Sequence, residues 1–189
     1  MATIKIKTWL IKILFLICTS ITVSSAQGQI LYTTTNGHVV VVAEQDSNRI
    51  IGESHKAFIV FNYQKAEIEA ILNLKTLDTG IDTLNQLLQT LKESEVKYKG
   101  KLGIDYIETK SHPPQTFDIL GMLTLNSVTK QVTFKATLTH LSNSSAFACL
   151  LTAGTTIKFV DFNIHQSVID SSETINIQIV QSVLRKDMR

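Results

Sequence analysis

The sequence has few cysteines for disulfide bonds and lacks the glycine-rich motifs of nucleotide-binding proteins. It contains two cysteines, two prolines and eight glycines in 189 residues. No stretch of Pro, Gly and Ser divides the chain and no internal repeat is present, so one domain is expected. The patterns Gly-x-Gly-x-x-Gly, Gly-x-x-x-x-Gly-Lys-Ser/Thr and Gly-x-Ser-x-Gly are all missing. The sequence therefore indicates no catalytic site and no cofactor.

The N-terminus differs from the rest of the chain. Residues 1–12 carry three lysines and no acidic residue, residues 11–17 are almost entirely apolar, and small residues lead to Ala26. This pattern is typical of a secretory signal peptide spanning 1–26. A membrane anchor is the alternative, but the apolar run is much shorter than the about 20 residues that cross a bilayer. Lipid attachment at Cys18 is a second alternative, although bulky residues precede that cysteine.

Removal of the leader changes the charge and the cysteine count. The eighteen Lys and Arg lose three lysines, which leaves fifteen basic residues against sixteen acidic ones. Such a balance gives no basic surface for nucleic acid or for an anionic membrane. Cys149 is then the only thiol, so an intramolecular disulfide is excluded. It lies in the apolar run 146–151, which favours a buried, inert thiol over a reactive one.

The mature chain alternates between apolar and polar residues. Residues 130–141, 174–179 and 66–74 follow this two-residue period, which is typical of strands with one buried face. Val, Ile, Thr and Phe dominate the other candidates, as strands favour. Further strands are predicted at 37–43, 56–63, 95–98, 103–108, 116–125 and 155–164.

One segment has helical spacing instead. In residues 80–93, Ile81, Leu84, Leu88 and Leu91 recur every three or four positions. The sequence predicts a short helix here, capped by Thr79 or Asp82 and packed on the barrel or over its mouth.

The count of about eight strands predicts an all-β fold, an antiparallel up-and-down barrel with one short helix, because closure removes the sheet edges. A two-sheet sandwich has the same residue pattern and remains open.

One stretch resembles a known family. Residues 121–134 read Gly-Met-Leu-Thr-Leu-Asn-Ser-Val-Thr-Lys-Gln-Val-Thr-Phe. They are similar to the strand-turn-strand "Gly-x-Leu-Thr-hydrophobic-x-Gly-Val-Thr-Lys-x-Val" of the YceI-like family, lipocalin-like barrels that bind polyisoprenoids. Residues 68–80, ending in Asp-Thr-Gly, and 159–164, with Asp-Phe-Asn, resemble two further family strands. The resemblance spans residues 39–180, nearly all of the mature chain.

The chain also departs from that family pattern. Ser127 and Asn163 stand where the family usually has glycine, so a left-handed turn conformation is expected at Asn126 or a different turn type. Residues 81–85 replace the usual Arg-Asp, and no proline precedes 95–98. The resemblance therefore implies a divergent member.

The resemblance implies a YceI-like barrel over 27–189 that is periplasmic or secreted and carries or sequesters an isoprenoid or related long apolar lipid without catalysis. An apolar interior would bind such a chain, since each methylene removed from water contributes about 0.8 kcal/mol. The alternatives are a secreted structural or interaction module without a cavity and, ranked lower, a lipid hydrolase. The candidate cavity-lining residues are Ile68, Leu72, Phe117, Ile119, Leu123, Val132, Phe134, Leu138, Phe159 and Ile177.

The five histidines are scattered singly along the sequence, and none has the spacing of a metal motif. No metal site is therefore predicted. A homodimer is compatible with the sequence, which does not fix the oligomeric state.

Overall fold

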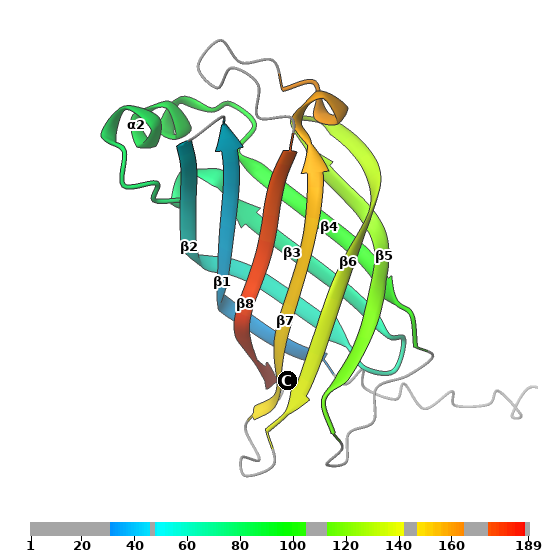
Figure 1. The fold of residues 1–189 in the computed structure, drawn as a ribbon. Coiled ribbons are helices and arrows are strands. Elements are labelled where there is room, and N and C mark those ends of the chain that lie inside the picture. Colours follow the sequence, from blue (N-terminus) through cyan, green and yellow to red (C-terminus); the bar gives the residue numbers. More distant parts are fainter. Residues whose placement is uncertain (1–30, 46–47, 105–112, 142–146, 165–173, 188–189) are drawn as a thin grey trace, which may run out of the picture.

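Eight antiparallel strands close into a barrel in the computed structural model, which describes residues 31–45, 48–104, 113–141, 147–164 and 174–187 (Figure 1). Each strand pairs with the next along the chain, and the last pairs with the first. The predicted up-and-down barrel is confirmed and the sandwich is excluded. The strands are β1 (Leu31–Gln45), β2 (Asn48–Asn62), β3 (Glu67–Asn73), β4 (Glu95–Leu102), β5 (Gln115–Leu125), β6 (Val128–His140), β7 (Phe147–Lys158) and β8 (Thr174–Lys186). The predicted signal peptide lies outside the described residues.

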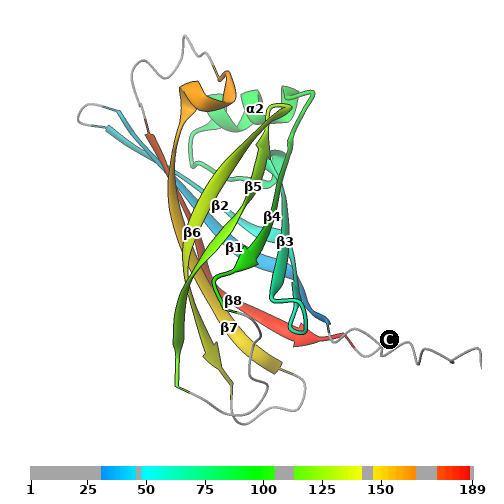
Figure 2. The same ribbon diagram turned by 90° about the vertical axis from the view of Figure 1, so that its right-hand side faces the viewer.

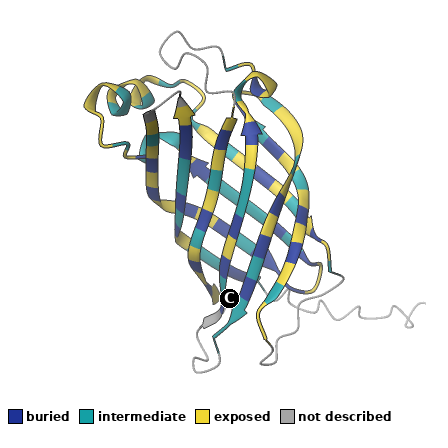
Figure 3. Cartoon of the chain, in the orientation of Figure 1, coloured by how far each residue is buried: buried dark blue, intermediate teal, exposed yellow. Residues whose placement is uncertain are grey.

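Side chains alternate along each strand between the apolar interior of the barrel and its solvent-exposed outer face. Along β5, Phe117 and Ile119 are buried while Asp118 between them is exposed. Figure 3 shows the same alternation of buried and exposed residues along the other strands. Because successive strand side chains point to opposite faces, the buried set forms the core inside the barrel.

Short helical segments gather at one end of the barrel, and β8 ends at the other (Figures 1 and 2). The helix α2 spans Asp82–Thr90 and follows a 3-10 turn, η1, at Leu74–Thr76. A second 3-10 turn, η2, spans Phe159–Phe162 after β7. We call the end that carries α2 and η2 the helical end. Within the part of the chain that the structure describes, no helix has the length and apolar character needed to cross a membrane.

The predicted helix at 80–93 is confirmed over Asp82–Thr90, but its predicted caps are wrong. Ile81 is the N-cap and makes no side-chain capping bond. The Thr79 hydroxyl instead accepts a hydrogen bond from the Ile81 N–H (3.2 Å) in the turn before the helix. An acidic residue in the first turn still suits the positive end of the helix dipole.

Two predicted strands differ from the structure. The strand predicted at 103–108 does not begin where expected, because Gly103 lies in a bend after β4; residues 105–108 lie outside the described part. The strand predicted at 155–164 ends at Lys158, because the chain winds into η2. Phe162 is buried in η2. If β7 continued as a strand, its two-residue alternation would place Phe162 on the outer face instead.

Candidate ligand-binding site

An apolar cavity of about 350 Å³ lies between α2 and the helical end of the barrel. Leu84 and Leu88 of α2 line one side, and Phe159 of η2 lines another. The inward faces of the strands supply Val41 and Ile175. The volume lies within the range of small-molecule pockets. We call it the mouth cavity.

A smaller cavity of about 60 Å³ lies deeper inside the barrel. On β1 it is lined by Val39, two residues from Val41, and on β8 by Ile177, two residues from Ile175. Residues two apart on a strand share one face. The two cavities therefore follow each other along the interior of the barrel.

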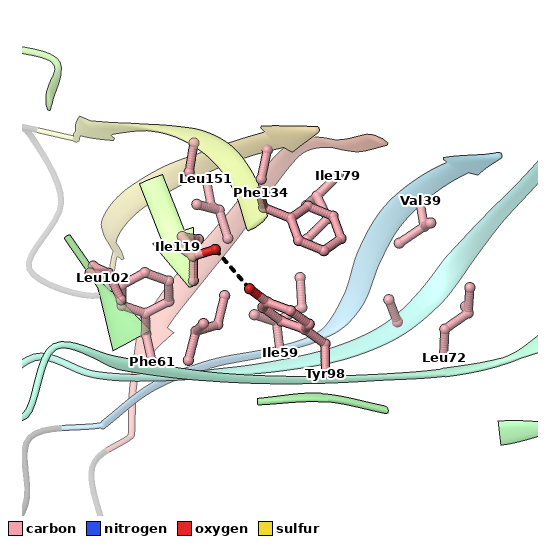
Figure 4. Packing of buried hydrophobic residues seen from close by; sticks show 14 of the residues in the cluster. Val39, Ile59, Phe61, Leu72, Tyr98, Leu102, Ile119, Phe134, Leu151 and Ile179 are labelled. Atoms are coloured by element: carbon pink, nitrogen blue, oxygen red, sulfur yellow. Dashed lines mark hydrogen bonds between the residues drawn. The ribbon is translucent and has the colours of Figure 1, made fainter. Parts of the chain in front are cut away.

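Two aromatic rings form the floor of the inner cavity. Tyr98 of β4 and Phe134 of β6 meet edge to face with ring centroids 4.8 Å apart (Figure 4). The Tyr98 hydroxyl donates to the carbonyl oxygens of Ile119 (2.8 Å) and Val132 (3.1 Å). Burial raises the pKa of Tyr98 to about 12, so the hydroxyl remains a donor at neutral pH. Gly121 makes room for the ring, because a Cβ there would lie 2.6 Å from it.

Beyond this floor the interior is filled by the protein's own side chains. Figure 4 shows Phe61, Leu102 and Leu151 on one side of the two rings and Val39 and Leu72 on the other. Phe61 and Leu151 are 0% exposed. We call this half the closed end; its fully buried side chains include Phe61, Ile119, Leu138, Leu151 and Leu184.

The predicted lining residues divide between the two halves. Leu72, Leu123, Phe134 and Ile177 line the inner cavity, and Phe159 lines the mouth cavity. The other five line neither cavity. Ile68, Phe117, Ile119 and Leu138 are buried in the core, and Val132 is half-buried beside the Tyr98 hydroxyl.

Sequence reasoning missed most of the mouth cavity. The apolar stripe of α2 already indicated a helix face that needs a partner, and Ile175 belongs to the same alternating run as Ile177. What the sequence did not reveal is which strand ends meet that helix. The missed lining residues include Val41, Leu74, Leu77, Leu84, Leu88 and Ile175.

The polar groups of the mouth cavity are few. Among the described lining residues they are the side chains of Thr79, Glu93, Asn126 and Asn163, and none of the described lining residues is Lys or Arg. The Asn126 amide donates to the Phe162 carbonyl (3.2 Å). The mouth therefore offers neutral dipoles and one carboxylate to the polar end of a ligand.

Cys149 offers no chemistry. It is 0% exposed, and the Tyr63 hydroxyl donates to its Sγ at 2.8 Å. Burial raises the pKa of Cys149 to about 12, so the group is a thiol rather than a nucleophilic thiolate at neutral pH. The prediction of a buried thiol is confirmed.

Two of the five histidines, which lie far apart in the sequence, meet in the structure. The rings of His38 and His55 stack with centroids 4.0 Å apart, and Glu53 lies beside them. The structure brings them together because β1 and β2 form a hairpin, which no local spacing reveals. These three residues could hold a metal ion.

A family model for the YceI-like domain matches residues 21–181. The chain belongs to the YceI-like family. Among curated protein sequences, none matches it significantly.

Solved structures agree with the family. A polyisoprenoid binding domain from Saccharophagus degradans, implicated in plant cell wall breakdown, is similar with a TM-score of 0.63 and 12% identity, over 84% of this chain and 98% of the other. BcnA from Burkholderia cenocepacia is similar with a TM-score of 0.56 and 14% identity, over 80% and 96%. The Campylobacter jejuni YceI protein gives 0.59 and 19% identity, over 76% and 88%. At these identities the likeness shows the fold.

This YceI-like chain keeps the turn geometry that the family's glycines suggest, with other residues. Asn126 and Ser127 form the two-residue loop between β5 and β6, with φ of 50° and 56°. Asn163 ends η2 with φ of 52°. Left-handed backbone suits Asn better than Ser, so Ser127 is the strained position of the three.

Proposed function

We propose that this YceI-like chain is an exported binding protein that holds the hydrocarbon chain of a neutral isoprenoid or related lipid in the mouth cavity, reversibly and without catalysis. The observation that carries the proposal is the apolar cavity of about 350 Å³ between α2 and the barrel. The Saccharophagus degradans neighbour, described as a polyisoprenoid binding domain, supports the same ligand class.

Burial of the chain supplies the affinity. Each methylene that leaves water contributes about 0.8 kcal/mol, so ten carbons contribute on the order of 8 kcal/mol before the cost of ordering the ligand. The half-buried Leu88, Val41 and Ile177 gain contacts when such a chain enters. Useful affinity therefore needs no charged anchor.

The floor limits the length of the bound chain. Tyr98 and Phe134 close the inner cavity, which itself measures only about 60 Å³. The mouth cavity of about 350 Å³ holds the part of an isoprenoid next to its head group, and the rest of a longer chain projects from it. We therefore expect affinity to rise with chain length and then to level off.

The mouth favours a neutral head group. Glu93 lines it, and in the part of the lining that the structure describes no basic side chain is present to pair with a carboxylate. A fatty acid would place its anion near Glu93; because Glu93 is exposed, the like-charge repulsion is modest and solvent-screened. An alcohol or quinone head can instead exchange hydrogen bonds with Asn126 and Thr79.

The alternatives fit less well. A module without a cavity does not account for the mouth cavity. A lipid hydrolase needs a nucleophile beside a base, and the described residues that line the mouth include neither a histidine nor a cysteine. Export rests on the leader predicted at 1–26, and fractionation of cells that express the full chain, with sequencing of the mature N-terminus, tests it.

The binding proposal is tested by titrating delipidated protein with farnesol and with a fatty acid of equal carbon number, in competition with a fluorescent apolar probe. We expect farnesol to displace the probe and the fatty acid to do so more weakly. Leu88→Glu places a charge in the mouth and should abolish displacement. The matched control is Leu120→Glu, because Leu120 is an exposed leucine (49%) on β5 that lines neither cavity.

Two results contradict the proposal. One is a probe that binds equally to the wild-type protein and to Leu88→Glu. The other is protein purified from its native host that yields no prenyl lipid on extraction and mass spectrometry and also ignores farnesol.

A further inference from the structure

Three metal-ligating side chains converge on the outer wall of the barrel, away from both cavities. They are His38 on β1 and Glu53 and His55 on β2, and one ligand atom of each lies within 4.8 Å of the others. The His38 Nε2 and Glu53 Oε2 atoms are 3.4 Å apart. The two imidazole rings stack with centroids 4.0 Å apart and planes inclined by 23°.

The hairpin register explains the convergence. From Gln45↔Asn48 to Val39↔Ser54, the β1–β2 pairing is regular, and one more step would place His38 opposite His55. A β-bulge begins there, so that His55 and Lys56 together oppose His38. Bulges aim side chains in new directions, and this one brings the two rings together on the outer face.

The backbone holds these residues in place. Glu53 exchanges two backbone hydrogen bonds with Asp78, at 2.9 and 2.8 Å. The His38 N–H donates to the Ser182 hydroxyl of β8 at 3.2 Å. Glu53 and His55 lie two apart on β2, so their side chains share one face. The three ligands therefore start from a framework of three paired strands and the chain before α2.

We infer that His38, Glu53 and His55 bind one divalent transition-metal ion such as Zn²⁺. Two imidazoles and one carboxylate are a known zinc ligand set that leaves a fourth position open. In tetrahedral coordination with bonds of about 2.0–2.1 Å, neighbouring ligand atoms lie about 3.3 Å apart. The His38–Glu53 distance already has that value, and the remaining atoms reach it through small side-chain rotations.

An unsatisfied nitrogen supports this assignment. The His38 Nε2 atom is shielded from solvent and makes no well-formed hydrogen bond among the described residues; its one charged neighbour is Glu53 Oε2 at 3.4 Å. A buried polar atom without a partner is unfavourable, and an unoccupied ion site is one of its recognised causes. A metal ion between His38 and Glu53 would satisfy both groups. The open fourth position would face the polar groove that His38 and His55 line with Asn36 and Ser182.

The test uses the untagged protein, stripped with a chelator and titrated with Zn²⁺ by calorimetry and with Co²⁺ by visible absorption. We expect one ion per chain at this site. His38→Ala, His55→Ala and Glu53→Gln should each weaken binding by about tenfold or more, because each removes a direct ligand. The matched controls are His140→Ala on β6 and Glu69→Gln on β3, which lie outside the cluster and should leave the affinity unchanged.

A second measurement separates binding from misfolding. Zn²⁺ should raise the melting temperature of the wild-type protein and of both controls, because the ion binds only the folded hairpin. It should not do so in His55→Ala, whose exposed position leaves the metal-free melting temperature unchanged. Equal Zn²⁺ affinity in the wild type, His38→Ala and His55→Ala, or no binding at all, would overturn the inference. Farnesol would contact the inner face of the β1–β2 wall, whereas the three metal ligands lie on its outer face, so either proposal can fail alone.

Discussion

The two halves of the barrel are built from the same alternating strands but end in opposite states. At the closed end, inward side chains such as Phe61 and Leu151 are 0% exposed. At the helical end, inward residues on the neighbouring strands β1 and β8, such as Val41 and Ile177, remain half-buried and line cavities. The floor of Tyr98 and Phe134 separates the two.

The difference shows how one barrel can have one end that stabilises the fold and another end that is free to bind a ligand. An eight-stranded barrel is just wide enough to be filled by side chains. Large residues fill it at the closed end, whereas α2 covers the helical end without plugging it. Because packing density determines stability, we expect the closed end to hold the fold together and the helical end to accept change.

The largest expected difference in the free energy of unfolding is between a Phe→Ala substitution at the closed end and one at the helical end. Phe61→Ala empties the closed end and should lower the free energy of unfolding by about 3–5 kcal/mol. Phe159→Ala in the mouth removes a half-buried ring and should cost about 1 kcal/mol. Denaturation in urea measures both. Equal losses would mean that the two halves are packed alike.

A smaller effect is expected at the floor itself. Gly121→Ala would place a Cβ against the Lys99 carbonyl and 2.6 Å from the Tyr98 ring. The paired backbones of β4 and β5 and the Tyr98 ring must then shift, at a cost of about 1–3 kcal/mol. The control is Gly154→Ala on β7, whose Cβ would meet nothing closer than the Ile177 carbonyl at 3.8 Å. If both variants melt at the wild-type temperature, Tyr98 is not held as tightly as proposed.

The sequence predicted the wall of the barrel better than its interior. Period-two runs such as 130–141 identify strands and their inner faces because burial follows alternation. The runs do not distinguish inner residues that fill the barrel from those that line a cavity. Ile119 and Leu123 occupy equivalent inward positions in the same pattern, yet of the two only Leu123 lines the inner cavity. That outcome depends on the size of the side chains on facing strands, and facing strands are distant in sequence.

Contacts across the hairpin were missed for a related reason. His38 and His55 are seventeen positions apart, and their meeting follows only from the β1–β2 register. A symmetric hairpin about residues 46–47 would have paired them. The prediction of 155–164 as one strand failed because local propensity does not reveal that Phe162 turns into the core.

Removing only the Tyr98 hydroxyl is a smaller change to the floor. Tyr98→Phe removes its bonds to Ile119 and Val132 and should cost about 1 kcal/mol at neutral pH. The pKa of Tyr98 is raised from 10.0 to about 12, so the folded state favours the neutral phenol. That stability is complete below pH 10 and is lost as the pH rises toward 12.

Unfolding of Tyr98→Phe, followed by urea denaturation from neutral pH to pH 12, should therefore depend less on alkaline pH than unfolding of the wild type does. The buried thiol of Cys149, with its pKa raised from 9.0 to about 12, contributes a loss of the same sign in both proteins. Parallel pH profiles for the two proteins would show that Tyr98 is not protected from ionisation by the fold.

The smallest effect is expected at the hairpin beside the mouth. Ser127 has φ of 56°, a conformation that costs an L-residue about 1 kcal/mol and glycine almost nothing. Ser127→Gly also loses an exposed bond from its hydroxyl to Glu93, so the net gain should be a few tenths of a kcal/mol. Asn126→Gly should act in the opposite direction, because its amide ties the hairpin to Phe162 and Asn163 of the η2 segment. Thermal melting of the two variants gives the signs. A destabilised Ser127→Gly would mean that the contact with Glu93 outweighs the strain, and that the rim of the mouth is held more firmly than its open packing suggests.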